Sequence, residues 1–313
     1  MTLIAAILSQ CKKDINFNVT IPVTIPVTIP DINFLKALIS MGVDKNGNGI
    51  ISTDEAALVH RISLFDHNIS DLKGIEAFTN LDSLYCFQTQ ITSLDVSNNT
   101  ALTWLDCFGN PLTSLDISKN TALSVLHCSG NQLTSLDVSN NTALTWLYCG
   151  NNQITSLDVS NNTALSVLYC FGNQLTNLDI SNNINLVGLD CAGNQITTLD
   201  VSNNTTLTGL YCSGNQITSL DVSNNTALTS LHCAGNQITS LDVSNNTALI
   251  LLYCYGNQLT SLDLSKNTAI KILNLSYMPS LSKVCVWTMP FPCSGITVYT
   301  EVSPNVFFTM ECN

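Results

Sequence analysis

The chain has 313 residues, of which only 10% are charged, and its net charge is −12. Binding to a nucleic acid needs clustered lysine and arginine, so this balance argues against a nucleic acid or another polyanion as partner. The sequence has no apolar run of about 18 residues and therefore no predicted membrane span.

The first eleven residues, MTLIAAILSQC, resemble a bacterial lipoprotein signal. The apolar run LIAAIL (3–8) ends shortly before Cys11, and charged residues begin directly after it. The resemblance implies a lipid on Cys11 and a location at the outer membrane. No basic residue precedes the apolar run, and Gln10 stands where a small residue is usual. The alternative is therefore an ordinary secretory signal, leading to a secreted protein, or an apolar start that occurs by chance.

Residues 12–30 follow this signal and contain the tetrapeptide VTIP three times in succession, at 19–30. A proline at every fourth position excludes a helix and favours an extended backbone. The segment is therefore predicted to be an extended tether that holds the rest of the protein away from a membrane.

Residues 31–61 are predicted to form a small helical cap. INFLKALISMG (32–42) has the pattern of a helix, and AALVHRI (56–62) is predicted as the start of another. Between them, DKNGNGIISTDE (44–55) matches the EF-hand loop at every defined position. The predicted ligands of a structural calcium ion are Asp44, Asn46, Asn48, Ile50, Ser52 and Glu55. The alternative is a turn rich in Asn and Gly that holds no ion.

Residues 62–80 are predicted to be an irregular first turn, and nine units of 21 residues then run without insertion or deletion over 81–269. Positions 1 and 4 of each unit are leucine, position 6 is cysteine, position 9 is asparagine in eight units, and position 11 is Leu or Ile. Positions 14 and 15 are always Leu-Asp. A constant period of about 20 residues with this pattern predicts a leucine-rich repeat solenoid.

The constant positions predict how each turn packs. One turn cannot bury its own apolar side chains, so the leucines at positions 1, 4, 11 and 14 are expected between neighbouring turns. The residues around the second leucine are predicted strands of a parallel β-sheet on the concave face, with short extended segments and turns on the convex face. The position-9 asparagine is expected to satisfy backbone groups inside the turn. The position-15 aspartate is expected to accept turn hydrogen bonds, with metal binding as the alternative.

Cysteine occupies position 6 in all nine units, where this repeat normally has a buried leucine. Free cysteine behaves as a small buried hydrophobe, so nine reduced thiols are predicted in the core. Neighbouring turns are close enough for pairing, but side chains in register point the same way and suit a disulfide poorly. The sequence has no C-x-x-C motif, which argues against zinc.

The unit L-x-x-L-x-C-x-x-N-x-L-T-x-L-D resembles the 21-residue cysteine-ladder repeat of internalin J-like proteins and of repeat lipoproteins of Gram-negative bacteria. The flanking segments DKNGNGIISTDEA and VCVWTMPFP also resemble those lipoproteins. The resemblance implies a bacterial cell-surface protein used for adhesion or ligand capture. Residues 270–313 are predicted to be a fading repeat followed by a β-rich C-terminal cap. The resemblance implies a disulfide between Cys285 and Cys312, which is one of three pairings that these residues and Cys293 allow.

All eleven aromatic residues of the nine units lie at positions 3, 5 and 7. Alternate side chains of a strand point to opposite faces, so these columns are predicted to face outward on the concave surface. Tyrosine and tryptophan grouped on one face are typical of interaction sites. The alternative is that the rings only stabilise neighbouring strands. The predicted ligand-binding residues are Tyr85, Phe87, Trp104, Asp106, Phe108, His127, Trp146, Tyr148, Tyr169 and Phe171.

Asp106, His127 and Ser129 are the residue types of a catalytic triad, and the repeat places them on neighbouring strands. An open, regular sheet offers neither an aligned base nor an oxyanion site, so we expect no enzyme. The sequence instead predicts a monomeric cell-surface protein that binds a protein or glycan and touches a membrane only through its lipid. The alternative is a structural surface or spacer protein without a specific ligand.

Overall fold

The computed structural model describes residues 25–64 and 68–312 of the chain. Cys11 and most of the expected tether lie outside these residues. The last part of the tether is extended, as predicted, but it lies against the cap. The N–H of Val27 donates to the carbonyl of Ile51 at 2.8 Å, and the N–H of Thr53 donates to the carbonyl of Ile25 at 2.8 Å. The folded region therefore begins before residue 31.

The cap contains two short helices, α1 (Ile32–Ser40) and α2 (Thr53–Ala56). Asp31 caps α1, because one carboxylate oxygen accepts from the N–H groups of Asn33 and Phe34 at 2.8 and 3.1 Å. Helix α1 buries Phe34 and Leu38 against the first turn of the solenoid. The N-terminal end of the apolar core is thereby covered, as a repeat array requires.

The helix expected over 56–62 is wrong. Helix α2 starts earlier, at Thr53, and ends at Ala56, and Arg61–Ser63 form strand β1. Strand β1 pairs in parallel with the first strand of the repeats, with Ile62 opposite Leu84. Both side chains are fully buried, so burial between two turns outweighs the weak helical pattern of this stretch. The first turn, predicted as irregular, thus contributes a regular strand and a short 3₁₀ helix, η1 (Ile75–Ala77).

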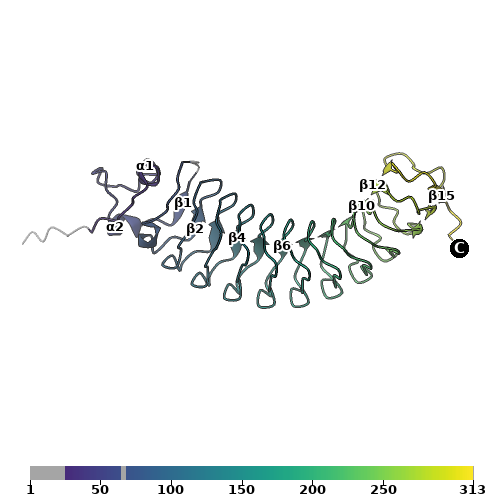
Figure 1. Cartoon of the computed structure of the whole chain (residues 1–313), viewed down its shortest axis with the longest axis horizontal. Helices are drawn as coiled ribbons and strands as arrows, with labels where there is room; N and C mark the ends of the chain where they lie inside the picture. Colours follow the sequence, from purple (N-terminus) through teal and green to yellow (C-terminus); the bar gives the residue numbers. More distant parts are fainter. Residues whose placement is uncertain (1–24, 65–67, 313) are drawn as a thin grey trace, which may run out of the picture.

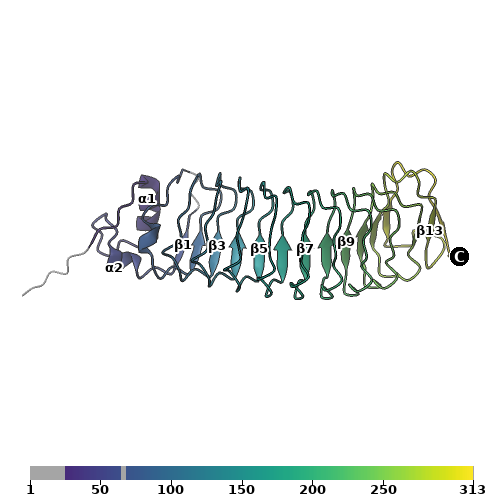
Figure 2. The same cartoon turned by 60° about the horizontal axis from the view of Figure 1, so that its bottom comes forward.

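The repeats stack along a curve, and one twelve-stranded parallel sheet follows its inner side (Figure 1). Figure 2 shows the strands side by side in a single layer. Equivalent residues of successive units lie opposite each other, as Leu147 does with Leu168, so the 21-residue period sets the register. The strands that follow β1 are β2 (Ser83–Tyr85), β3 (Trp104–Asp106), β4 (Val125–His127), β5 (Trp146–Tyr148), β6 (Val167–Tyr169), β7 (Gly188–Asp190), β8 (Gly209–Tyr211), β9 (Ser230–His232), β10 (Leu251–Tyr253), β12 (Ile272–Asn274) and β14 (Thr297–Tyr299).

The C-terminal segment is rich in β-strands, as predicted, but its strands continue the solenoid. Strands β12 and β14 extend the large sheet, and a second sheet of three parallel strands forms on the other side of the turns. The second sheet consists of β11 (Ser261–Asp263), β13 (Lys283–Cys285) and β15 (Phe307–Thr309). A disulfide joins Cys285 to Cys312, the pair that the family resemblance implies. The chain therefore ends in two further turns of the stack and not in a separate layer.

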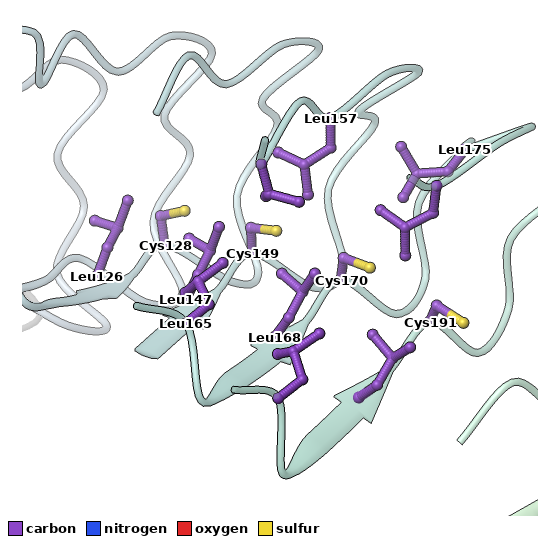
Figure 3. Packing of buried hydrophobic residues seen from close by; sticks show 14 of the residues in the cluster. Leu126, Cys128, Leu147, Cys149, Leu157, Leu165, Leu168, Cys170, Leu175 and Cys191 are labelled. Carbon is purple, nitrogen blue, oxygen red and sulfur yellow. The ribbon is translucent and has the colours of Figure 1, made fainter. Parts of the chain in front are cut away.

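Each turn contributes the same buried set of side chains to one continuous core. The leucines at positions 1 and 4 and the cysteine at position 6 are fully buried throughout. Figure 3 shows Cys128, Cys149, Cys170 and Cys191 with their sulfur atoms pointing the same way beside the leucines. All nine thiols are free, as the sequence predicted. Within residues 25–64 and 68–312, no helix has the length and apolar character that a membrane crossing requires.

The position-9 asparagine holds neighbouring turns together, as expected. In the unit of Asn173, the side-chain amide donates to the carbonyls of Cys149 and Cys170, both at 3.0 Å. Its carbonyl oxygen accepts from the N–H of Ile154 at 3.0 Å. In the first unit, the hydroxyl of Thr89 replaces this amide and donates to the carbonyl of Cys86. These bonds satisfy backbone groups that no strand partner reaches.

A second asparagine column, at position 19, was not predicted. Asn183 is fully buried, and its amide donates to the carbonyls of Val159 and Asn162 at 3.0 and 2.9 Å. Its side-chain oxygen has no hydrogen-bond partner in the structure. The column therefore closes the convex turns through its donor atoms alone.

The burial of the ladder predicts inert thiols. Burial raises the pKa of Cys149, Cys191 and Cys233 to about 12, so the reactive thiolate is almost absent at neutral pH. We expect a thiol reagent to label none of the nine ladder cysteines in the folded protein and all nine after denaturation, measured by mass spectrometry of peptides. The partly exposed Cys293 is an internal positive control. Labelling of native ladder thiols, or disulfides among them, would contradict the reduced core.

Candidate binding face

The outward side chains of the large sheet form the candidate site. In each repeat strand from β2 to β10, the middle leucine is buried and the first and third side chains point to the concave surface. Strand alternation therefore places the aromatic columns where the sequence predicted. Of the eleven aromatic residues, Trp146 (40%) and Tyr255 (37%) are the most exposed, and the others are partly buried. The rings thus cover one another as well as the sheet.

The first five units carry a continuous run of ring contacts. Trp146 lies edge-on to Trp104, with ring centroids 6.2 Å apart, and contacts Tyr148 at 6.5 Å. Tyr148 continues to Tyr169 at 5.2 Å. At the other end, the guanidinium of Arg61 lies 4.5 Å from the ring centroid of Tyr85. The structure therefore brings residues from four repeat units into one surface.

The position-7 phenylalanines border this run. A Cβ atom at Gly150 would lie 2.6 Å from the Phe171 ring, so the ring occupies space that only a glycine leaves free. The ring of Phe108 stacks on His127 with a centroid distance of 5.0 Å. Phe87 is partly buried at the same column position. We call this surface the aromatic run. It consists of Tyr85, Phe87, Trp104, Asp106, Phe108, His127, Trp146, Tyr148, Tyr169 and Phe171.

Asp106 and His127 add a carboxylate and an imidazole to the aromatic run. The His127 Nδ1 atom lies 3.4 Å from the Asp106 Oδ1 atom, and this oxygen also accepts from the N–H of Phe108 at 3.1 Å. In the described chain, no hydrogen bond joins His127 to Ser129, whose side chain is buried. The three residues are therefore not arranged as an activated nucleophile, which requires a base in hydrogen-bond contact with it.

A second run of contacts, in units 7–9, was missed because these units contain few aromatic residues. His232 lies between Tyr211 and Tyr253, with ring centroids at 4.6 and 4.4 Å. Burial lowers the pKa of His232, so its ring is neutral at physiological pH. The signal was present in the sequence, since all three residues occupy position 5. Only the short distances between the rings show that the three side chains are in contact.

The aspartates at position 15 lie on the convex side and have a structural role. In the unit of Asp179, the Oδ1 atom accepts from the N–H of Ser181 at 2.9 Å, and the other eight units repeat this bond. The hydrogen bonds from Ser181 lower the pKa of Asp179, because they stabilise the carboxylate. The predicted turn hydrogen bonds are confirmed.

The cap loop has a set of oxygen atoms that suits a hard cation, but the loop already uses them. The Asp44 carboxylate accepts from the N–H groups of Gly47 and Gly49, each at 2.8 Å. Glu55 accepts from the N–H groups of Lys45, Asn46 and Ser52 and from the Ser52 hydroxyl. These four donors fill the four acceptor positions of one carboxylate. A calcium ion would compete with them for Glu55.

The side-chain oxygens of Asn46 and Asn48 also accept local N–H groups, at 3.0 and 2.8 Å. Ile50 is exposed, and its carbonyl accepts no hydrogen bond from the described residues. The loop therefore keeps its shape through its own hydrogen bonds, while each of the two amide oxygens still has one unused lone pair.

We propose that this loop binds calcium weakly. At a calcium concentration tenfold above Kd, mass action would stabilise the native state by about 1.4 kcal/mol. We expect a corresponding rise in melting temperature with calcium, reversed by a chelator and absent in Asp44→Asn, which keeps an acceptor oxygen but loses one charge. Magnesium is the control, because it prefers water ligands in octahedral geometry. An identical melt with calcium and with chelator would show that internal hydrogen bonds alone maintain the loop.

Parallel strands on the inner side of a curved stack, with leucine and asparagine at fixed positions, define a leucine-rich repeat protein with a cysteine ladder. The family model for leucine-rich repeats (2 copies) matches residues 142–183 and 205–246. The functional domain of InlJ from Listeria monocytogenes, described as including a cysteine ladder, is 31% identical, with 84% of this chain and 76% of that chain covered and a TM-score of 0.53. The chain belongs to the leucine-rich repeat family, in the internalin J-like class with a cysteine ladder.

Two further solved structures share the fold. An internalin, InlF, from Listeria monocytogenes is 21% identical over 93% of this chain and 98% of that one, with a TM-score of 0.68. A leucine-rich repeat protein of Leptospira interrogans is 22% identical over 75% of this chain and 74% of that one, with a TM-score of 0.63. None of the curated proteins matches the chain by sequence. These likenesses support the architecture and leave the ligand to be inferred from the face itself.

Proposed function

We propose that this protein is a cell-surface binding protein that captures a protein or glycan ligand on its concave aromatic face. One observation carries the proposal: all eleven aromatic residues of the repeats lie in the outward columns of one sheet, and eight of them contact a neighbouring aromatic or histidine ring. We further propose that a lipid on Cys11 attaches the protein to the outer membrane, with secretion as the alternative.

The distribution of side chains favours binding over a purely structural role. The buried columns of leucine, cysteine and asparagine repeat in every unit and are sufficient to hold the stack together. The outward columns change from unit to unit, and they bring tryptophan and tyrosine together at β3, β5 and β6. These residue types dominate binding energies because they bury a large area with few rotatable bonds. A spacer would need none of them at the surface.

The test is to immobilise the whole protein and present it with two sets of candidates, a glycan array and a solubilised extract of surface proteins. We expect saturable capture of one ligand from one of the two sets. Competition by that ligand, and loss of capture after substitutions in the aromatic run, would locate the site on the concave face. If neither set yields a ligand that competes, the spacer alternative replaces the proposal.

A further inference from the structure

The two runs of ring contacts are separated by one repeat unit that carries no aromatic side chain. In this unit, the outward positions 3, 5 and 7 are Gly188, Asp190 and Ala192, and position 3 of the next unit is Gly209. The strand register places Asp190 directly between Tyr169 and Tyr211. A carboxylate therefore interrupts the position-5 column near the middle of the concave face.

Two glycines lie next to the tyrosine rings that flank Asp190 in the strand register. A Cβ atom at Gly188 would lie 3.6 Å from the Tyr169 hydroxyl, and one at Gly209 would lie 3.0 Å from the Tyr211 ring. Each ring thus lies beside the position-3 column; a Cβ at Gly188 would make an ordinary van der Waals contact with Tyr169, whereas one at Gly209 would press on the Tyr211 ring. Asp190 has a tyrosine on either side in the register and the small residues Gly188 and Ala192 in its own unit, and it is only partly buried.

The carboxylate of Asp190 has no cationic partner. Its Oδ1 atom accepts from the N–H of Ala192 at 3.0 Å, and no ion pair within the described chain involves it. Asp106, the other aspartate in this column, lies against His127. Burial raises the pKa of Asp190, because part of its hydration has been lost without a compensating charge. Positions 3, 5 and 7 of the nine units contain no lysine or arginine that could move into place.

These features together fit one kind of ligand group. A cation placed between two tyrosine rings gains from the negative faces of both, and the carboxylate supplies an opposite charge in a partly desolvated setting. Asp190 is already partly desolvated in the free protein, so a bound cation would not have to remove all the water from the carboxylate. A guanidinium suits the site better than an ammonium, because it is planar, stacks on rings and can bond to both carboxylate oxygens.

We propose that Asp190, Tyr169 and Tyr211 form a subsite that receives an arginine or lysine side chain of a protein ligand. The inference rests on the proposed function and makes it more specific, since it selects a protein with an exposed basic residue over a neutral glycan. The net charge of −12 favours the approach of such a partner. The aromatic run next to this subsite would contact the residues that flank the basic side chain.

The experiment needs no identified partner. Tyrosine is replaced throughout by 3-fluorotyrosine, and the ¹⁹F resonances of Tyr169 and Tyr211 are assigned with the Tyr169→Phe and Tyr211→Phe variants. The protein is titrated with N-acetyl-arginine amide and, separately, with N-acetyl-citrulline amide, which has nearly the same shape but no charge. We expect both assigned resonances to shift saturably with the arginine compound, and at least tenfold weaker binding of the citrulline compound.

Asp190→Asn should weaken binding of the arginine compound at least tenfold, because the amide keeps the bond to Ala192 but removes the charge. Asp200→Asn is the matched control, since Asp200 is an exposed aspartate of the same repeat unit on the convex side. It makes the same change in net charge and should leave the titration unchanged. Equal binding of the two compounds, or an Asp190→Asn titration like that of the wild type, would overturn the proposal.

The outcome is separable from that of the proposed function. If a captured protein ligand loses affinity with Trp146→Ala but not with Asp190→Asn, the binding face stands and the cation subsite falls. If the captured ligand is a neutral glycan, the subsite also falls. A tenfold or larger loss with Asp190→Asn for a captured protein, with Asp200→Asn unchanged, supports the subsite.

Discussion

Replacing Asn173 by alanine should lower the free energy of unfolding by about 2–6 kcal/mol. The N–H of Ile154 would lose its acceptor in the core, which alone costs about 1–3 kcal/mol for a buried unsatisfied group. The carbonyls of Cys149 and Cys170 would each lose one of two donors, because a neighbouring asparagine also donates to each. Each lost bond adds about 0.5–1.5 kcal/mol. The measurement is urea unfolding followed by circular dichroism.

Two control variants separate the loss of hydrogen bonds from the loss of side-chain volume and from the general effect of replacing an asparagine by alanine. Asn173→Asp keeps the size of the side chain but directs an oxygen at two carbonyls, so it should destabilise at least as strongly as alanine. Asn182→Ala removes an exposed asparagine that makes a single 3.3 Å bond across the convex turns, and it should change stability by about 0.5 kcal/mol or less. If Asn173→Asp were harmless, the asparagine column would matter only through packing.

The regular part of the fold could be predicted because the residues that each turn needs recur at the same positions of every repeat unit. Leucine and cysteine at fixed positions indicate the buried side, and the strands at Trp146–Tyr148 and Val167–Tyr169 lie where the position-4 leucines required them. The ends could not be predicted in the same way. Arg61–Ser63 carries a helix-like pattern, and only the presence of a neighbouring strand makes it extended. The strands of the last two turns likewise depend on pairing partners outside the period.

The candidate face could be predicted as a set of columns, but not as a surface. Alternation along a strand sends positions 3 and 5 outward whatever the side chain, so the location of Trp104 and Trp146 followed from spacing. Their environments differ all the same: Trp146 is 40% exposed, while the Trp104 indole nitrogen is buried without a hydrogen-bond partner. Such differences depend on how neighbouring rings pack. The position of Asp190 between two tyrosines likewise depends on strand pairing, which brings residues from three repeat units side by side.

Truncating Trp146 or Tyr169 to alanine should each weaken ligand binding by about 2 kcal/mol, or about thirtyfold in Kd. Trp146 is the most exposed ring of the aromatic run, and Tyr169 contacts Tyr148 next to it. Both offer a large apolar area that a ligand can cover. The affinity of the captured ligand is measured by calorimetry or surface plasmon resonance, and the double variant tests coupling. Since Trp146, Tyr148 and Tyr169 are in contact, we expect the double loss to differ from the sum of the single losses.

The stability of the same variants distinguishes anchors from structural rings. If the rings served only to hold neighbouring strands together, truncation would destabilise the fold and leave ligand affinity unchanged. We expect the reverse, with a change in unfolding free energy within about 1 kcal/mol for side chains on the surface. Asn161→Ala, in an exposed convex turn, should alter neither quantity by a comparable amount. A ligand whose affinity survives both Trp146→Ala and Tyr169→Ala would place the binding site away from the concave face, at one of the two ends of the solenoid.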